Sequence, residues 1–204
     1  MSDRKDIELI AELVPNGSRV LDLGCGDGEL LSLLQRERAC SGYGIEIADT
    51  NILACVEKNV HVIQMDLEAG LSEFEPQSFD LVILSQTLQA MRNIELVVTE
   101  ILRVGRQGIV TIPNFGYWRR RVQIIGGRMP VSRDLPYQWY DTPNIHLCTF
   151  VDFEKFCRDH GVHILERHVM CDGEDVSVLP NLLGNLAVYR FEKEARGGCP
   201  ASPE

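Results

Sequence analysis

The chain has 204 residues, of which 45% are hydrophobic and 25% charged, enough apolar sequence for one α/β domain and too much for a disordered chain. Thirty acidic residues against 20 basic ones give a formal net charge of -10, which argues against a primary role on nucleic acid, because phosphate-binding surfaces are normally basic. No apolar run approaches the ~18 residues of a membrane span and no secretion signal opens the chain, so we expect a cytoplasmic protein that does not bind membranes.

The seven cysteines are scattered and form no CxxC pair. An odd number with this spacing is typical of reduced thiols, and it predicts neither a disulfide framework nor a zinc site. We therefore expect no metal in the protein.

Helical and strand patterns alternate along the chain. A first helix has its apolar face at Ile7, Ile10, Leu13 and Val14. Strands are predicted at 19–23, 43–47, 60–65, 79–84, 108–112, 163–170 and 186–192, with helical segments around 30–34, 52–56, 94–102 and 150–160. Thr149 is the expected N-cap of the last helix. This order predicts an α/β fold with a doubly wound, mainly parallel seven-stranded sheet and an antiparallel hairpin at one edge.

No repeat or linker interrupts residues 5–193, so we expect one domain over residues 1–193. Residues 116–146 interrupt the alternation with three prolines, two tryptophans and three tyrosines. Excursions of this length in a compact domain are more often functional than structural. The final segment, EARGGCPASPE (194–204), is expected to be a disordered tail.

The strongest motif is VLDLGCGDG (20–28), a strand that runs into a glycine turn and then a helix. Glycines allow a sharp turn and close approach of a ligand to the backbone. The spacing is G-x-G-x-G, whereas a dinucleotide fingerprint requires G-x-G-x-x-G, and position 29 is a glutamate. Asp27 and Glu29 place negative charge where a pyrophosphate would lie, so a cationic or zwitterionic ligand such as S-adenosylmethionine fits better.

Acidic residues follow the next two predicted strands. Glu46 ends the second strand, about 20 residues beyond the glycine turn, where a carboxylate can accept both ribose hydroxyls. Asp66 ends the third strand, where an adenine edge would lie. Either residue could instead be a helix N-cap, but with the glycine turn they favour S-adenosylmethionine binding.

Residues 18–112 resemble the class I S-adenosylmethionine-dependent methyltransferases. The match to one family is closer: VLDLGCGDGELL, YGIEI, FDLVILSQTLQAM, VTIPNFGYWRRR and TPNIHLCTFVDFEKFC, in this order, resemble the MetW methionine-biosynthesis proteins over nearly the whole chain. This resemblance implies a Rossmann-like methyltransferase domain with a role in methionine synthesis beside a homoserine O-acyltransferase. The G-x-S-x-G motif of an acyltransferase nucleophile is absent from this chain.

The superfamily resemblance also assigns the ligand-binding residues. It implies that Asp22, Gly24 and Gly26 hold the methionine end of S-adenosylmethionine, that Glu46 holds the ribose, and that Asp66 with Leu67 holds the adenine. Ser85, just after the fourth strand, is a further ligand-binding candidate. The sequence after that strand lacks the Asn/Asp-Pro-Pro-Tyr/Phe motif of nucleic-acid amino-methylating enzymes, so nucleic acid is again not the expected substrate.

Catalytic residues are harder to assign, because methyl transfer needs positioning more than acid–base help. His146 and Tyr117 are the candidates; His146 could be a general base, or a residue that fixes its loop. The aromatic residues of 116–146 are expected to form a lid or a protein-binding face. Arg119, Arg120 and Arg121 are expected on a solvated helix face rather than in an anion site.

Two functions of different classes follow. The chain binds S-adenosylmethionine and regulates its acyltransferase partner, or it is a small-molecule methyltransferase that uses the same ligand. A nicotinamide-dependent enzyme, suggested by Gly24, Gly26 and Glu46, is disfavoured by the position of Gly28.

Overall fold

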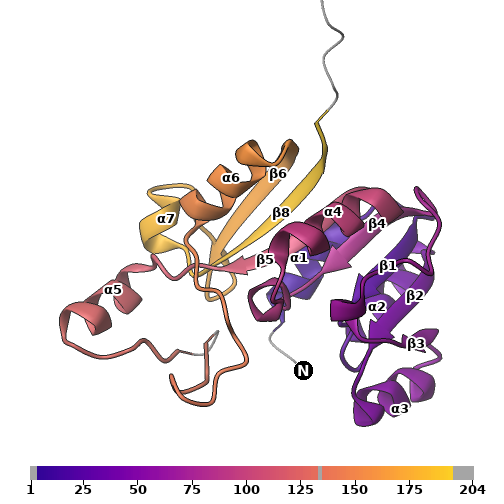
Figure 1. The fold of residues 1–204 in the computed structure, drawn as a ribbon, viewed down its shortest axis with the longest axis horizontal. Coiled ribbons are helices and arrows are strands. Elements are labelled where there is room, and N and C mark those ends of the chain that lie inside the picture. Colours follow the sequence, from indigo (N-terminus) through magenta and orange to yellow (C-terminus); the bar gives the residue numbers. More distant parts are fainter. Residues whose placement is uncertain (1–3, 133–134, 195–204) are drawn as a thin grey trace, which may run out of the picture.

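One sheet of eight strands runs through the computed structural model, which describes residues 4–132 and 135–194. Its spatial order is β3-β2-β1-β4-β5-β8-β6-β7 (Figure 1). The strands are β1 (Arg19–Leu23), β2 (Ser41–Glu46), β3 (Val62–Gln64), β4 (Phe79–Leu84), β5 (Gly105–Pro113), β6 (Val162–Cys171), β7 (Glu174–Asp175) and β8 (Leu186–Lys193). The first five pair in parallel and the last three antiparallel, so the predicted fold class is confirmed.

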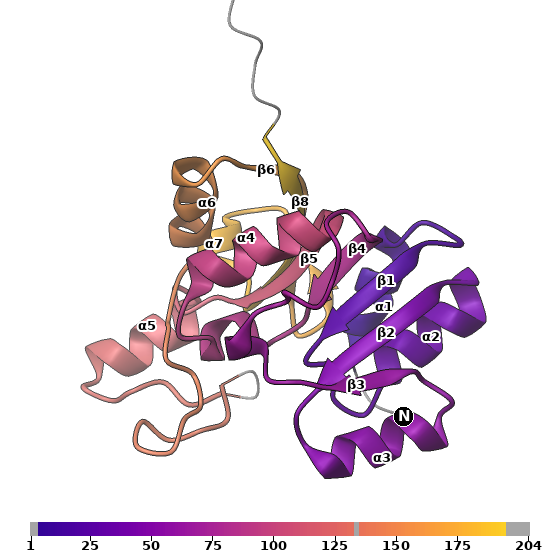
Figure 2. The ribbon, with the colours of Figure 1, turned by 45° about the vertical axis from the view of Figure 1, so that its right-hand side comes forward.

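Helices cover both faces of the sheet, as Figure 2 shows. They are α1 (Lys5–Leu13), α2 (Glu29–Arg38), α3 (Asp49–Glu57), α4 (Ile94–Val104), α5 (Trp118–Ile125), α6 (Phe150–Asp159) and α7 (Pro180–Leu183). One hydrophobic core joins the sheet to α4 and α6, and a second joins it to α1, α2 and α3. Strand β1 contributes to both cores, because successive side chains of a strand point to opposite faces of the sheet. Leu21 belongs to the first core and Val20 to the second.

The antiparallel end of the sheet is held by β8, the last strand in the chain, which lies between β5 and β6. Gly108 of β5 faces Phe191 of β8, and a Cβ at Gly108 would lie 2.5 Å from the Phe191 ring. The glycine therefore makes room for this aromatic side chain in the core. The eighth strand, β7, has only two residues and was not predicted, because so short a segment carries no apolar pattern.

Local capping positions α6 as predicted. The Thr149 hydroxyl accepts a hydrogen bond from the Asp152 backbone N–H, and the Asp152 carboxylate accepts one from the Thr149 backbone N–H. This reciprocal arrangement satisfies two backbone donors at the start of the helix. It fixes the point at which the chain returns from 116–146 to the sheet.

We call residues 116–146 the arm; it includes α5 and extends from the sheet at the left of Figure 1. Asn114 anchors its base. This side chain is fully buried, donates to the backbone oxygens of Asn181 and Gly184, and accepts from the Gly116 N–H. Three backbone groups are thereby satisfied by one side chain in a place where an unpaired group would be costly.

One prediction for the arm is wrong. Arg120 is only 1% exposed, so the three arginines do not share a solvated face. Its guanidinium group donates to the Asn114 backbone oxygen and to the Ser132 hydroxyl. The sequence pattern of three consecutive arginines could not reveal this, because these partners are brought to the middle arginine by the tertiary fold.

Two further expectations concern the ends of the chain. The predicted tail, 194–204, lies outside the described residues except for Glu194. Among the described residues, no helix has the length and apolar character needed to cross a membrane.

Candidate ligand-binding site

The glycine turn between β1 and α2 lies at the carboxyl ends of the parallel strands, where open α/β sheets bind ligands. Gly24, Gly26 and Gly28 all have left-handed backbone angles, with φ of 70°, 54° and 76°. A Cβ at Gly24 would lie 3.0 Å from the Thr87 hydroxyl, whereas a Cβ at Gly26 would meet nothing within 4 Å. Gly24 thus packs against the loop after β4, and Gly26 borders open space. We call the region beside Gly26, between the glycine turn, the end of β2 and the loop after β4, the crevice.

The turn is tied to the end of β2. The Gly24 and Cys25 N–H groups both donate to the Ile45 backbone oxygen, at 2.8 and 3.0 Å. The Gly26 N–H donates to Glu46 Oε2 at 2.9 Å. The two predicted ligand-binding segments, the turn and the acidic strand end, are therefore brought together.

The Glu46 carboxylate is already engaged by the backbone. Oε1 accepts hydrogen bonds from the Ile47 and Ala48 N–H groups at 2.8 and 3.0 Å, in addition to the Gly26 bond to Oε2. A carboxylate has about four acceptor positions, so about one remains, on Oε2. The carboxylate can accept one ribose hydroxyl in this state, and a second would require one backbone bond to be given up.

Asp22 is a buried carboxyl group near the end of β1. It is 2% exposed, and no hydrogen bond to its carboxyl group comes from any described residue. Burial raises the pKa of Asp22 to about 7; the positive charge of Arg4 opposes this rise and the negative charge of Glu46 adds to it. A buried carboxyl group with no donor favours a cationic ligand group beside it.

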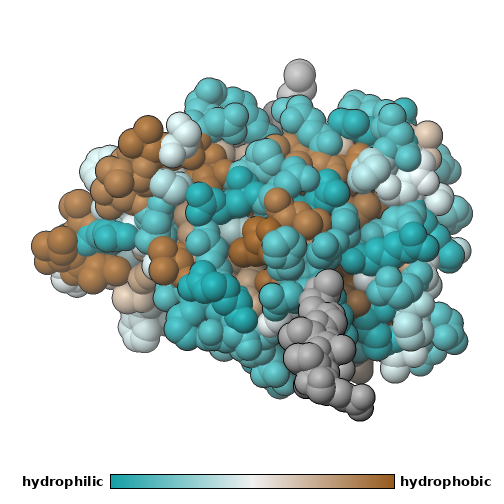
Figure 3. Space-filling model, turned by 90° about the horizontal axis from the view of Figure 1, so that it is seen from above, coloured by the Kyte–Doolittle hydropathy of each residue, from teal (hydrophilic) through white to brown (hydrophobic). Residues whose placement is uncertain are grey.

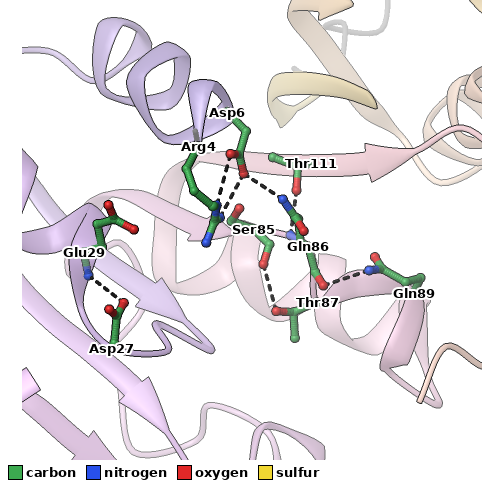
Figure 4. Close-up of polar contacts among 9 residues, drawn as sticks. All are labelled: Arg4, Asp6, Asp27, Glu29, Ser85, Gln86, Thr87, Gln89 and Thr111. Atoms are coloured by element: carbon green, nitrogen blue, oxygen red, sulfur yellow. Dashed lines mark hydrogen bonds and ion pairs between the residues drawn. The ribbon is translucent and has the colours of Figure 1, made fainter. Parts of the chain in front are cut away.

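A cluster at the start of α1 faces the glycine turn and was not predicted (Figure 4). Arg4 Nη2 lies 2.9 Å from Asp6 Oδ2, and the Gln86 side chain donates to the same oxygen at 2.8 Å. Burial raises the pKa of Asp6, but the hydrogen bond and positive charge of Arg4, together with the hydrogen bond from Gln86, give a net downward shift. Arg4 also acts electrostatically on Asp27, across the crevice. The positive charge of Arg4 thus acts on two carboxyl groups at the glycine turn, Asp22 and Asp27. The sequence pattern identified this segment only as the start of an amphipathic helix.

The loop after β4 supplies the opposite wall. Gln86 has a left-handed φ of 52°, and its backbone N–H donates to the Thr111 hydroxyl at 2.6 Å. The Ser85 hydroxyl is buried and has no hydrogen-bond partner among the described residues. An unpaired hydroxyl beside the crevice is consistent with the candidate role of Ser85, since buried polar groups normally have partners.

The structure gives Asp66 a local role at the other end of the crevice. Its Oδ1 accepts a hydrogen bond from the Glu68 N–H at 2.9 Å and caps the short helix Leu67–Ala69. Leu67 packs against the first core. The capping alternative for Asp66 is therefore realised, and any contact with an adenine would involve its remaining acceptor positions.

The two catalytic candidates lie in different surroundings. His146 lines an apolar cavity of about 130 Å³ beside the ends of β4 and β5. Other side chains of its wall are Leu88, Gln89, Ile112, Phe115, Phe153 and Phe156. Tyr117 is not part of that wall; it is buried, and its hydroxyl accepts a hydrogen bond from Cys171 at the end of β6. One hydrogen bond joins the cavity wall to the loop beside the crevice: the Gln89 side chain donates to the Gln86 backbone oxygen (Figure 4).

Comparison with known proteins identifies the family of this chain. The family model of the methionine biosynthesis protein MetW matches residues 4–191. The chain belongs to the MetW family. The resemblance inferred from the sequence motifs is thereby confirmed, and the family associates the chain with methionine biosynthesis.

One relative joins the family to a second unit. The chain is 35% identical over 206 residues to the bifunctional methionine biosynthesis protein MetXA/MetW of Rhodopirellula baltica. The match covers 94% of this chain but only 33% of that protein, so the chain spans about a third of the relative's length.

Solved structures show how widely the fold is used. An S-adenosylmethionine-dependent methyltransferase from Thermotoga maritima is 16% identical, with a TM-score of 0.68 over 95% of this chain and 89% of that one. The [4+2]-cyclase SpnF is 19% identical, with a TM-score of 0.67 over 95% of this chain and 82% of that one. Because a methyltransferase and a cyclase share this fold, the fold does not identify a reaction for the MetW family.

Asp22 should make stability fall as pH rises. Its folded pKa of about 7 is above the unfolded value of 3.8, so the stabilisation is complete below pH 3.8 and is lost as pH rises through 7. Replacement of Asp22 by Asn should remove a penalty of about 1.4 kcal/mol per pH unit across this window. We expect the Asn variant to melt at a higher temperature than the unmodified protein at pH 8, with a smaller difference at pH 5, in thermal unfolding followed by circular dichroism.

The control is Asp175→Asn, which changes an exposed carboxylate on β7. This variant should melt like the unmodified protein at both pH values. A difference between Asp22→Asn and the unmodified protein that is the same at pH 5 and pH 8 would show that the Asp22 carboxyl group is not the titrating group.

Proposed function

We propose that this chain binds S-adenosylmethionine in the crevice and regulates a homoserine O-acyltransferase partner in methionine biosynthesis. The observation that carries the proposal is the bifunctional relative, in which a MetW unit and a MetXA unit share one polypeptide. Fusion places two units at a high effective concentration, which is useful when they act together. This chain has no acyltransferase nucleophile motif, so the acyl transfer would be done by the partner.

The chemistry of the crevice supports this ligand. S-adenosylmethionine has a sulfonium, an ammonium and a carboxylate, and no phosphate. The buried Asp22 carboxyl group would hold the ammonium group, and the Arg4 guanidinium group would hold the carboxylate. The open space at Gly26 would admit the ligand to the backbone, and the free position on Glu46 would accept a ribose hydroxyl.

A regulatory role would explain why the chain binds S-adenosylmethionine. S-adenosylmethionine is made from methionine, so its concentration reports on the output of the pathway. A ligand changes the behaviour of a partner only if it binds the assembled and the separate chain with different affinity. The proposal therefore requires a measurable coupling between the ligand and the partner.

Calorimetric titration tests that coupling. We expect S-adenosylmethionine to bind the purified chain, and to bind with an affinity at least fivefold different when the homoserine O-acyltransferase of the same organism is present. By reciprocity, the ligand should change the affinity between the two proteins by the same factor. Failure of the proteins to associate, with or without ligand, would contradict the regulatory role. Association without S-adenosylmethionine binding would contradict the assignment of the crevice as its binding site.

Gly26→Ala tests the assignment at one residue. The new methyl group would occupy the open space beside the turn, so affinity for S-adenosylmethionine should fall at least tenfold. Gly17→Ala is a matched control, because Gly17 also has a left-handed φ, 74°, and open space around it, but lies in the turn before β1. Both variants should lose about 1 kcal/mol of stability to the left-handed backbone. Equal affinity for S-adenosylmethionine in the two variants would show that Gly26 is not part of the binding site.

A second candidate function is small-molecule methyl transfer, favoured by the cavity beside the crevice. The cavity is almost wholly apolar and has a volume of about 130 Å³, close to that of a site which holds one benzene-sized group. When bound, S-adenosylmethionine would supply the methyl group; His146 on the cavity wall would take the proton of the acceptor.

Mass spectrometry of cell extract, incubated with the protein and methyl-labelled S-adenosylmethionine, tests this second function. A labelled product should form, and His146→Gln should lower its rate more than tenfold at unchanged ligand affinity. The absence of any labelled small molecule across extracts would leave the regulatory function as the better account.

A further inference from the structure

The arm carries an unusual share of the exposed apolar surface. Nine of the 19 exposed large hydrophobic side chains of the described residues lie in its 31 positions. Ile125 is 86% exposed, Trp139 72% and Tyr140 71%. In Figure 3, brown apolar surface gathers at the left-hand end of the molecule, where the arm lies. A concentration of this kind marks an interaction site, whereas single exposed hydrophobic residues do not.

Hydrogen bonds hold the arm at its base. Arg120 is buried and bridges the Asn114 backbone oxygen and the Ser132 hydroxyl across the arm. On the segment that returns to α6, the backbone N–H groups of Ile145 and His146 both donate to the Gln89 oxygen. Such bonds reduce the ordering entropy lost at these positions when a partner binds.

The composition of this face is that of a protein interface. Tryptophan, tyrosine, methionine and arginine are enriched in such interfaces, and tryptophan, tyrosine and arginine dominate their energetic centres. The arm exposes Trp118, Trp139 and Met129 together with Arg119 and Arg128. Its described residues include three exposed arginines (119, 121 and 128) and one exposed aspartate (141), in a protein of net charge -10. The complementary surface is therefore apolar with a rim of carboxylates.

We propose that the outer face of the arm is the docking surface for the acyltransferase chain, a proposal that rests on the proposed function. A second copy of this chain fits less well. An isologous dimer through the arm would place the arginines of one copy against those of the other, and like charges at an interface are costly. An arm bound to the acidic body of another copy would make a head-to-tail contact, which forms a closed ring only at particular rotations.

A continuous set of hydrogen bonds leads from this surface to the ligand crevice. The arm backbone at residues 145–146 donates to the Gln89 backbone oxygen, the Gln89 side chain donates to the Gln86 oxygen, and the Gln86 side chain donates to Asp6. Asp6 in turn pairs with Arg4. Docking on the arm and ligand binding in the crevice therefore act on the same loop after β4.

The test compares variants of exposed hydrophobic residues in the arm with variants of exposed hydrophobic residues in α3, which lies on the other side of the molecule (Figure 1). Ile125→Asp and Trp139→Ala change the arm; Leu53→Asp and Val56→Ala change α3, where these two side chains are 64% and 61% exposed. Affinity for the purified homoserine O-acyltransferase is measured by calorimetry, and S-adenosylmethionine binding by the same method shows that each variant is folded. We expect each arm variant to lose at least tenfold in affinity for the acyltransferase, and each α3 variant less than twofold.

The outcomes separate this inference from the proposed function. If the unmodified chain does not bind the acyltransferase, the proposed function fails. If it binds and the arm variants bind equally well, only the docking surface is overturned. If the unmodified chain is dimeric and the arm variants become monomeric at unchanged affinity for the acyltransferase, the arm is an interface between copies, and the inference is overturned in favour of that occupant.

Discussion

The site depends on one local constraint, the attachment of the glycine turn to the end of β2. Two backbone N–H groups of the turn share the Ile45 oxygen, and a third binds the Glu46 carboxylate. These bonds require the left-handed angles that glycine adopts without strain. The same turn leaves the Asp22 carboxyl group buried at its base and Gly26 open to the crevice. A change that releases the turn from β2 would therefore affect the charge, the shape and the entrance of the site together.

Much of this arrangement was predictable because it is local in the sequence. The strand–turn–helix order around Asp22, the buried strands and the Thr149 cap each follow from a short pattern, and all are present. The parts that were missed depend on tertiary contacts that no local pattern shows. The buried Arg120 binds the Asn114 backbone oxygen and the Ser132 hydroxyl, and Gln86, 80 residues beyond Asp6, binds the carboxylate that pairs with Arg4.

The fold alone leaves the activity open, since a methyltransferase and a cyclase share it with this chain. In this chain, the acidic residues around the glycine turn and the apolar, arginine-bearing arm occur in one domain. The loop after β4 is common to both, because it receives hydrogen bonds from the arm and donates one to the start of α1. The proposed coupling between ligand and partner would act through this loop.

The arm also gives the protein a built-in optical signal. The sequence contains two tryptophans, and both lie in the arm, Trp118 at 42% exposure and Trp139 at 72%. Indole emission shifts to shorter wavelength when water is removed from around the ring. The intrinsic fluorescence of the whole chain therefore reports on the surroundings of one short segment, and it distinguishes a covered arm from a bare one without any label.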